Sequence, residues 1–227
     1  MFDKHLQTLL HTQQRQRARM IERLKSQGIS DSRVLEAMNK VPRHIFVQEA
    51  FASRAYEDTA LPLGMRQTIS QPYIVSKMIE ILYKDRQTLG KVLEIGTGCG
   101  YQAAVLAQLT LQVFSLERIA TVLDLAKKHF QTLKETRIRV KYTDGNNGLP
   151  EAAPFDSIIV AAAAPGIPSA LLQQLAVKGR LILPVCDEHN PENQYLSQID
   201  HLTPGNYKET RLEAVKFVPL LGGKKAN

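Results

Sequence analysis

Apolar residues in the first ninety positions of the chain recur with the spacing of helices. The pattern over residues 4–27 predicts a helix, which Gly28 ends. A second helix is predicted between Gly28 and Pro42, with Asp31 or Ser32 as its N-cap. These two helices would form a small helical part in front of the rest of the chain.

Residues 45–70 show no regular period. The segment carries several aromatic and aliphatic side chains, so we expect it to be irregular but packed on the core. Pro72 suits the first turn of a helix, and Ser70 or Gln71 would then be the cap. The helical stripe that follows consists of Ile74, Val75, Met78, Ile79 and Leu82.

From residue 91 onward, short apolar runs alternate with helical patterns. Strands are predicted at 91–95, 112–117, 138–143, 155–161 and 180–185, and helices at 101–109, 118–134 and 168–177. Such alternation predicts an α/β fold with a doubly wound, mostly parallel sheet that is covered on both faces. Two further strands, 194–203 and 211–220, flank a turn-like Thr-Pro-Gly-Asn sequence, which predicts an antiparallel hairpin.

A glycine-rich turn follows the first of these strands. The sequence of residues 92–101 is Val-Leu-Glu-Ile-Gly-Thr-Gly-Cys-Gly-Tyr, which predicts a strand, a tight turn and a helix N-terminus. The pattern suits a nucleotide-like ligand, and it also suits a glycine-rich connection without a ligand. The turn lacks the Gly-Lys-Ser/Thr of a Walker loop and the Gly-x-Gly-x-x-Gly of a dinucleotide site. It also offers no basic residue to a phosphate.

Three acidic residues are expected near the carboxyl ends of the strands, where open α/β sheets bind ligands. Glu117 follows Gly96 by about 20 residues, a spacing that suits two ribose hydroxyls, although a surface acid at a helix start would look the same. Asp144 can accept from an adenine amino group and Gly145 can leave room for the ring, or the two can form an Asp-Gly turn. Glu94 lies in an apolar strand, so it needs a donor from the fold or from a ligand.

Acidic residues around such a crevice would repel phosphates but attract a sulfonium cation and an ammonium group. S-adenosyl-L-methionine carries both, together with ribose and adenine, so it is the predicted cofactor. No metal site is expected, because the histidines show no ligand spacing and the two cysteines stand far apart. No Gly-x-Ser-x-Gly nucleophile motif is present.

The composition of the 227-residue chain is globular, with 44% hydrophobic and 22% charged residues. It has no apolar run that could span a bilayer, no apolar signal-peptide core and only two cysteines, which predicts a reduced, cytoplasmic protein. The net charge of +7 is compatible with nucleic acid, but much of it lies in the first helix without interleaved aromatics. We therefore expect a solvated helix face, no nucleic-acid or membrane partner, and a monomer.

Several segments match the motifs of one known family. They are Val41-Pro42-Arg43, Ala55-Tyr56-Glu57-Asp58, Leu61-Pro62-Leu63-Gly64, Gln67-Thr68-Ile69-Ser70-Gln71-Pro72-Tyr73, the glycine-rich turn, Leu116-Glu117-Arg118-Ile119, Asp144-Gly145 and Phe217-Val218-Pro219-Leu220. Through them the chain closely resembles the protein-L-isoaspartate O-methyltransferases over nearly its whole length. The glycine turn suits any methyltransferase of this fold, whereas the Thr-Ile-Ser-Gln-Pro and Phe-Val-Pro-Leu segments are far more specific.

The resemblance implies a seven-stranded, Rossmann-like methyltransferase sheet that uses S-adenosyl-L-methionine. We expect one domain, with a helical part at 1–88 that carries the substrate segment, a cofactor-binding sheet at 89–221 and a tail at 222–227. The implied substrates are L-isoaspartyl or D-aspartyl residues of damaged proteins and peptides. Methylation of their free carboxylate would start repair through a succinimide.

The resemblance also implies roles for individual residues. Ser70 falls on the serine that the family treats as its active-site residue, and Glu117 falls on the ribose-binding acid. The other residues expected to bind the substrate are Thr68, Ile69 and Gln71. The residues expected to bind the cofactor are Glu94, Gly96, Thr97, Gly98, Glu117, Asp144 and Gly145.

Four positions depart from the family pattern. Arg66 stands where glycine is usual, and we expect its side chain to point to solvent rather than to pair with a substrate carboxylate. Cys99 replaces a common serine, Ala161 a common threonine and Thr143 a usual glycine. These differences bear on rate or specificity more than on the type of reaction.

In the resulting hypothesis, an already ionised substrate carboxylate attacks the sulfonium methyl group without a general base. Ser70 would orient the carboxylate as a hydrogen-bond donor, not as a nucleophile. Two alternatives stay open, a methyltransferase acting on RNA or another substrate and a non-catalytic cofactor-binding protein. The missing Asn/Asp-Pro-Pro-Tyr motif and Pro-Cys pair speak against the first alternative, while Arg66 and Ala161 allow the second.

Overall fold

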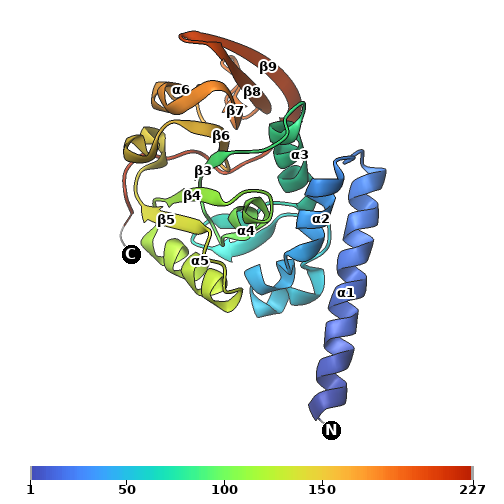
Figure 1. Ribbon diagram of the computed structural model, residues 1–227. Coiled ribbons are helices and arrows are strands. Elements are labelled where there is room, and N and C mark those ends of the chain that lie inside the picture. The colour runs from blue at the N-terminus through green and yellow to red at the C-terminus, as the bar shows by residue number, and fades with distance from the viewer. Residues whose placement is uncertain (1, 226–227) are drawn as a thin grey trace.

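A computed structural model describes residues 2–225, with side chains from residue 12 onward. Helices α1 (Phe2–Ser26) and α2 (Ser32–Lys40) lie at one side of a central sheet, and the first turns of α1 extend away from the body (Figure 1). Asp31 caps α2 by accepting from the backbone N–H of Arg33, which confirms one of the two predicted caps. None of the described helices combines the length and the apolar character needed to cross a membrane.

Seven strands form the central sheet in the order β5-β4-β3-β6-β7-β8-β9. The strands are β3 (Lys91–Ile95), β4 (Gln112–Glu117), β5 (Ile138–Tyr142), β6 (Phe155–Val160), β7 (Leu175–Cys186), β8 (Gln194–Thr203) and β9 (Asn206–Val215). The five strands from β3 to β7 are parallel to their neighbours, and β8 and β9 are antiparallel additions. The predicted doubly wound, mostly parallel α/β fold is therefore confirmed.

The two faces of the sheet bury different side chains. The remaining helices are α3 (Pro72–Tyr83), α4 (Tyr101–Ala107), α5 (Ala120–Thr132) and α6 (Ser169–Gln174). In β3, Val92 belongs to a buried cluster with residues of α1 to α5, whereas Leu93 and Ile95 belong to one with residues of α6. Successive strand side chains point to opposite faces, so helices cover both sides of the sheet.

Residues 45–70 are more regular than predicted. Two short 3-10 helices, η1 (Arg43–Phe46) and η2 (Glu49–Arg54), precede a hairpin of β1 (Leu61–Gly64) and β2 (Gln67–Ile69). The sequence pattern does not reveal the hairpin because its turn holds Met65 and Arg66 at φ of 51° and 59°, where glycine or asparagine is usual. Buried Phe46 and Leu61 confirm that the segment packs on the core.

The start of α3 brings a partner from upstream in the chain. Gln71 holds the cap position without a side-chain hydrogen bond, so Ser70 lies one residue before the cap and does not serve as one. The backbone N–H of Tyr73 donates instead to Asp58 Oδ1 at 2.9 Å. Of the two predicted caps, Gln71 is thus confirmed in position and Ser70 is not the cap, so the Ser70 hydroxyl stays available for another role.

The last strand lies earlier than predicted. The pattern predicts a strand at 211–220, but β9 spans Asn206–Val215, and the chain then runs across the carboxyl ends of the sheet. This crossing segment forms single backbone contacts, in which Ala163 N donates to Val218 O at 2.8 Å and Leu220 N donates to Ala163 O at 2.7 Å. The apolar residues after Val215 therefore cover strand ends instead of pairing in the sheet. The helix predicted at 168–177 likewise ends at Gln174, because β7 begins at the next residue.

Candidate active site

A cavity of about 470 Å³ lies at the carboxyl ends of β3, β4 and β6, where the strand order reverses. Its volume is in the range of small-molecule sites. Most of the predicted site residues line it, namely Thr68, Ile69, Ser70, Gln71, Gly96, Thr97, Gly98, Glu117 and Gly145. The predicted residues Glu94 and Asp144 do not line it. The cavity thus brings together the segments predicted for the substrate and for the cofactor.

The glycine turn after β3 has the conformation that its sequence predicts. Gly96, Gly98 and Gly100 have φ values of 91°, 55° and 90°, a region that other residues rarely adopt. A Cβ at Gly100 would lie 2.6 Å from the ring of Phe130, so this glycine also permits close helix packing. The backbone N–H groups of Gly96 and Thr97 both donate to Leu116 O, which fixes the turn against the end of β4.

Glu117 closes the end of β4 with a carboxylate held by three backbone N–H groups. Its Oε2 accepts from Gly98 at 3.0 Å, and its Oε1 accepts from Arg118 at 2.8 Å and Ile119 at 3.0 Å. A carboxylate has about four acceptor positions, so one direction at Oε2 remains for a ligand. Glu117 therefore both shapes the glycine turn and presents an acceptor to the cavity.

Glu94 lies behind the glycine turn and is completely buried. It accepts from Gln102 Nε2 at 3.1 Å and from the Ser115 hydroxyl, which lies 2.6 Å from the hydroxyl of Thr97. Burial raises the pKa of Glu94 to about 8, although the hydrogen bonds from Ser115 and Gln102 act to lower it. Glu94 is therefore mostly protonated at neutral pH and reaches the cavity through Ser115 and Thr97.

Asp144 does not line the cavity; its carboxylate binds the C-terminal tail instead. Its Oδ1 accepts from the backbone and side-chain nitrogens of Asn146, and its Oδ2 accepts from Gly223 N at 2.6 Å. Burial acts to raise the pKa of Asp144, but the bonds from Gly223 and Asn146 outweigh it and the pKa is lowered. Neighbouring Gly145 does line the cavity, and a Cβ there would lie 2.3 Å from Ile95 Cγ2. Its lack of a side chain accommodates Ile95.

Arg43 supports the predicted substrate segment from beneath. Its guanidinium is fully buried, donates to Ala55 O at 2.8 Å and to Ser70 O at 2.7 Å, and stacks over the Tyr101 ring. Burial lowers the pKa of Arg43, but an arginine stays charged in proteins. No carboxylate forms an ion pair with it among the described residues. Arg43 thus fixes the backbone of Ser70, whose hydroxyl has no hydrogen-bond partner within residues 12–225.

The structure also places the residues that depart from the family pattern. Arg66 is exposed and outside the cavity, which agrees with the expected orientation toward solvent. Cys99 and Ala161 both line the cavity. Burial raises the pKa of the Cys99 thiol to about 11, so it is not a nucleophile at neutral pH. The backbone N–H of Thr143 donates to Glu117 O at 3.0 Å.

Sequence reasoning did not identify the C-terminal side of the cavity as part of the site. Residues 213–221 also line it, and Glu213 accepts from the Tyr73 hydroxyl at 3.2 Å. The Phe-Val-Pro-Leu motif in this segment was the one signal that could have pointed to it. In the part of the chain with described side chains, no group of three His, Cys, Asp or Glu residues could hold a metal ion.

Comparisons with known proteins identify relatives of this chain. A family model described as protein-L-isoaspartate(D-aspartate) O-methyltransferase matches residues 15–225. The protein-L-isoaspartate O-methyltransferase of Dechloromonas aromatica is 61% identical over 212 residues, covering 93% of this chain and 96% of the relative. That of Methylobacillus flagellatus is 54% identical over 215 residues, covering 93% and 94%.

Solved structures show the same fold. One named protein-L-isoaspartate O-methyltransferase has a TM-score of 0.82 at 28% identity, covering 91% of this chain and 66% of that one. A candidate enzyme of this name from Plasmodium falciparum, in complex with S-adenosyl-L-homocysteine, has a TM-score of 0.80 at 24% identity, covering 90% and 98%.

Proposed function

The chain belongs to the protein-L-isoaspartate(D-aspartate) O-methyltransferase family, and we infer that it methylates the free carboxylate of isoaspartyl residues in damaged proteins and peptides. S-adenosyl-L-methionine is the methyl donor, and when bound it supplies an electrophilic methyl group on a sulfonium. D-aspartyl residues are a second proposed substrate, since the family model names them. The alternative activity on RNA has no support from these relatives.

The single observation that carries this function is the shared cavity. It joins the glycine turn and Glu117 to the segment from Thr68 to Gln71 within one space of about 470 Å³. Methyl transfer between two bound molecules needs them side by side, and holding them so supplies much of the rate.

The glycine turn and Glu117 would hold the cofactor. Glu117 keeps an acceptor direction for a ribose hydroxyl, and Gly96, Thr97 and Gly98 let the ligand approach the backbone. Gly145 would form the part of the cavity wall that lies close to the adenine. We propose that Glu94 and Asp144 act from behind this wall, Glu94 by supporting the turn and Asp144 by anchoring the tail.

The substrate carboxylate is ionised at neutral pH, so this chain need not remove a proton from it. We propose that the Ser70 hydroxyl donates a hydrogen bond that orients the carboxylate, while Thr68, Ile69 and Gln71 shape the space around it. Arg43 acts as a positioning residue, because it fixes the Ser70 carbonyl. The methyl ester formed can close to a succinimide without the enzyme, and hydrolysis then returns some normal aspartate.

A labelled methyl-transfer assay tests the function. Tritiated S-adenosyl-L-methionine is incubated with the enzyme and an isoaspartyl peptide, its normal aspartyl twin, or RNA. Labelling of the isoaspartyl peptide alone, with release of methanol by mild base, is the expected result. Base-stable label in RNA would replace the proposal with the RNA methyltransferase, and no transfer to any acceptor would favour a non-catalytic cofactor-binding protein.

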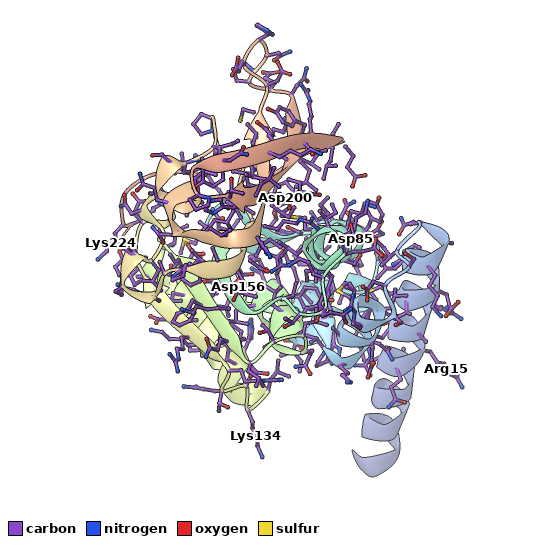
Figure 2. The ribbon with its side chains drawn as sticks, turned by 45° about the horizontal axis from the view of Figure 1, so that its top comes forward. Arg15, Asp85, Lys134, Asp156, Asp200 and Lys224 are labelled. Atoms are coloured by element: carbon purple, nitrogen blue, oxygen red, sulfur yellow. The ribbon has the colours of Figure 1, made fainter. Side chains whose placement is uncertain are left out.

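We further propose that the protein works as a single-domain monomer in the cytoplasm without a nucleic-acid partner. One buried cluster joins the helical part to the sheet, and the cavity is lined by residues of one chain. The basic residues Arg15, Lys134 and Lys224 lie on separate parts of the surface (Figure 2). Both cysteines are free, which suits a reducing compartment. Light scattering, cell fractionation and an RNA-binding assay test these points.

A further inference from the structure

Glu213 differs from the other charged residues that line the cavity. Those residues are Glu117, Arg118 and Lys216. Glu117 accepts from three backbone N–H groups, Arg118 donates to two carbonyls of the C-terminal tail, and Lys216 Nζ donates to Glu192 O at 3.0 Å. Among these four residues, only Glu213 has a buried oxygen, Oε1, that finds no hydrogen-bond partner in the described part of the chain.

The position of Glu213 is set by one hydrogen bond. The Tyr73 hydroxyl donates to its Oε2 at 3.2 Å. Burial, and after it the charge of Glu213, raises the pKa of Tyr73, so this phenol stays protonated at neutral pH and remains a donor. The carboxylate is thereby held by one oxygen, while the other, Oε1, is buried without a hydrogen-bond partner in the described part of the chain.

This carboxylate belongs to the substrate end of the cavity. Tyr73 lies in the first turn of α3, directly after the segment from Thr68 to Gln71, and its hydrogen bond therefore ties Glu213 to the predicted substrate segment. Within the described residues no cation forms an ion pair with Glu213. A buried acceptor without a partner is costly, and the cost is removed when a ligand donates to it.

We propose that Glu213 is a specificity-determining residue that accepts a hydrogen bond from a basic side chain next to the isoaspartyl residue of the substrate. A lysine or arginine at that place forms a charge-assisted bond with the free oxygen. An acidic neighbour meets a like charge and is disfavoured, which is how interfaces reject wrong partners. The inference rests on the proposed function and adds a preference for substrate sequence.

The test compares kcat and KM for isoaspartyl peptides that differ only in carrying Lys or Glu at the positions flanking the isoaspartyl residue. With the unmodified enzyme, kcat/KM should favour the Lys peptide by about tenfold or more, as expected for a hydrogen bond between charged groups. In Glu213→Gln the preference should fall to about twofold. The change should lie in KM, and the Kd of the cofactor should stay the same.

Glu209→Gln is the matched control. Glu209 lies on the same strand, is exposed, and accepts from Ser197 Oγ at 2.6 Å outside the cavity. Its replacement removes the same charge and should keep the tenfold preference. The inference is overturned if the preference survives in Glu213→Gln, if Glu209→Gln abolishes it equally, or if Glu213→Gln mainly raises the cofactor Kd.

A second measurement uses only the unmodified enzyme, so it tests the inference even if Glu213→Gln folds poorly. Raising the ionic strength from about 0.05 M to about 0.5 M should compress the Lys-over-Glu preference of the unmodified enzyme, because salt screens charges. An absent or reversed preference at low salt, or one that salt does not change, contradicts the role of Glu213. Failure of the proposed function looks different, because then neither isoaspartyl peptide is methylated.

Discussion

The cofactor wall, residues 95–98 and 116–119, and the substrate wall, residues 67–71, 73 and 213–218, line one cavity. In the cofactor wall, residues close in sequence satisfy each other, as when Gly98, Arg118 and Ile119 all donate to Glu117. In the substrate wall the supports come from far along the chain, as when Tyr73 donates to Glu213. Within the described residues, one buried oxygen of Glu213 in this wall remains without a partner.

The difference matches the two ligands. A cofactor of constant structure is served by a wall that is complete before it binds, because no reorganisation is then needed. Damaged proteins present isoaspartyl residues in many sequence contexts, so a wall with open donor and acceptor positions suits them. Variants in the two walls should therefore alter different measured quantities.

The largest effect is expected from Glu94, the buried acid behind the cofactor wall. The pKa of Glu94 rises from the 4.5 of an ordinary glutamate to about 8 in the folded state, so the folded protein holds this proton more tightly. The contribution to stability is complete below pH 4.5 and is lost progressively as the pH rises to about 8. The full span corresponds to roughly 5 kcal/mol.

Glu94→Gln isolates this effect, because an amide mimics the protonated acid toward Ser115 and Gln102. Urea unfolding at pH 5.5 and pH 8.5 should show a smaller loss of stability in the variant than in the unmodified protein. Equal losses in the two proteins would show that Glu94 does not carry the pH dependence.

Glu117→Ala should have the second largest effect, and it should weaken cofactor binding. It removes the ligand acceptor and leaves three backbone N–H groups without theirs, a change of about 3 kcal/mol, or roughly a hundredfold in cofactor Kd. Calorimetric titration measures the Kd, and kinetics at saturating cofactor should show a much smaller change in peptide KM. If the peptide KM rose by a larger factor than the cofactor Kd, the two walls would not differ in the way described.

Ser70→Ala tests the substrate wall with a smaller effect. Loss of one hydrogen bond to a charged carboxylate should cost about 2 kcal/mol, or roughly thirtyfold in kcat for an isoaspartyl peptide. The cofactor Kd should stay within about twofold, since the Ser70 hydroxyl has no contact with the glycine turn. A parallel loss of cofactor affinity would move Ser70 out of the role proposed for it.

Arg66→Gly should have the smallest effect, and it should be stabilising. Arg66 has φ of 59° in the turn of the β1–β2 hairpin, and glycine relieves the steric cost of that conformation. The gain, about 0.5–1 kcal/mol, is reduced by the greater freedom of glycine in the unfolded chain. Thermal unfolding measures it, with Lys134→Gly, at φ of 53° outside the cavity, as the control. A raised peptide KM in Arg66→Gly alone would show that Arg66 contacts the substrate.

Much of the sheet could be predicted because its strands are short apolar runs between glycines and helical patterns. The bounds of β3, β4 and β8 match those expected from the sequence. The β1–β2 hairpin could not be seen, because its strands are very short and Met65 and Arg66 give no turn signal. The end of β9 was misplaced because apolar residues that cover strand ends look the same in sequence as residues that pair.

For the site residues, the position in the fold could be predicted from the sequence, but the hydrogen-bond partners could not. The sequence places Glu94, Glu117 and Asp144 near strand ends, but only the fold decides which partners they meet. Glu117 lines the cavity. Glu94 instead accepts hydrogen bonds from Ser115 and Gln102, and Asp144 accepts one from Gly223 in the tail. No local motif marks Glu213, since its neighbour Tyr73 is 140 residues away in the chain.

The tail beyond the cavity has a practical consequence for handling the protein. Asp144 accepts from Gly223 N, Arg118 donates to Gly223 O, and Lys225 N donates to Arg118 O at 2.7 Å. An affinity tag fused after this tail, or a protease that trims it, would disturb these hydrogen bonds and with them the neighbouring segment that lines the cavity. Purification tags therefore belong at the N-terminus, where the first turns of α1 extend away from the body (Figure 1).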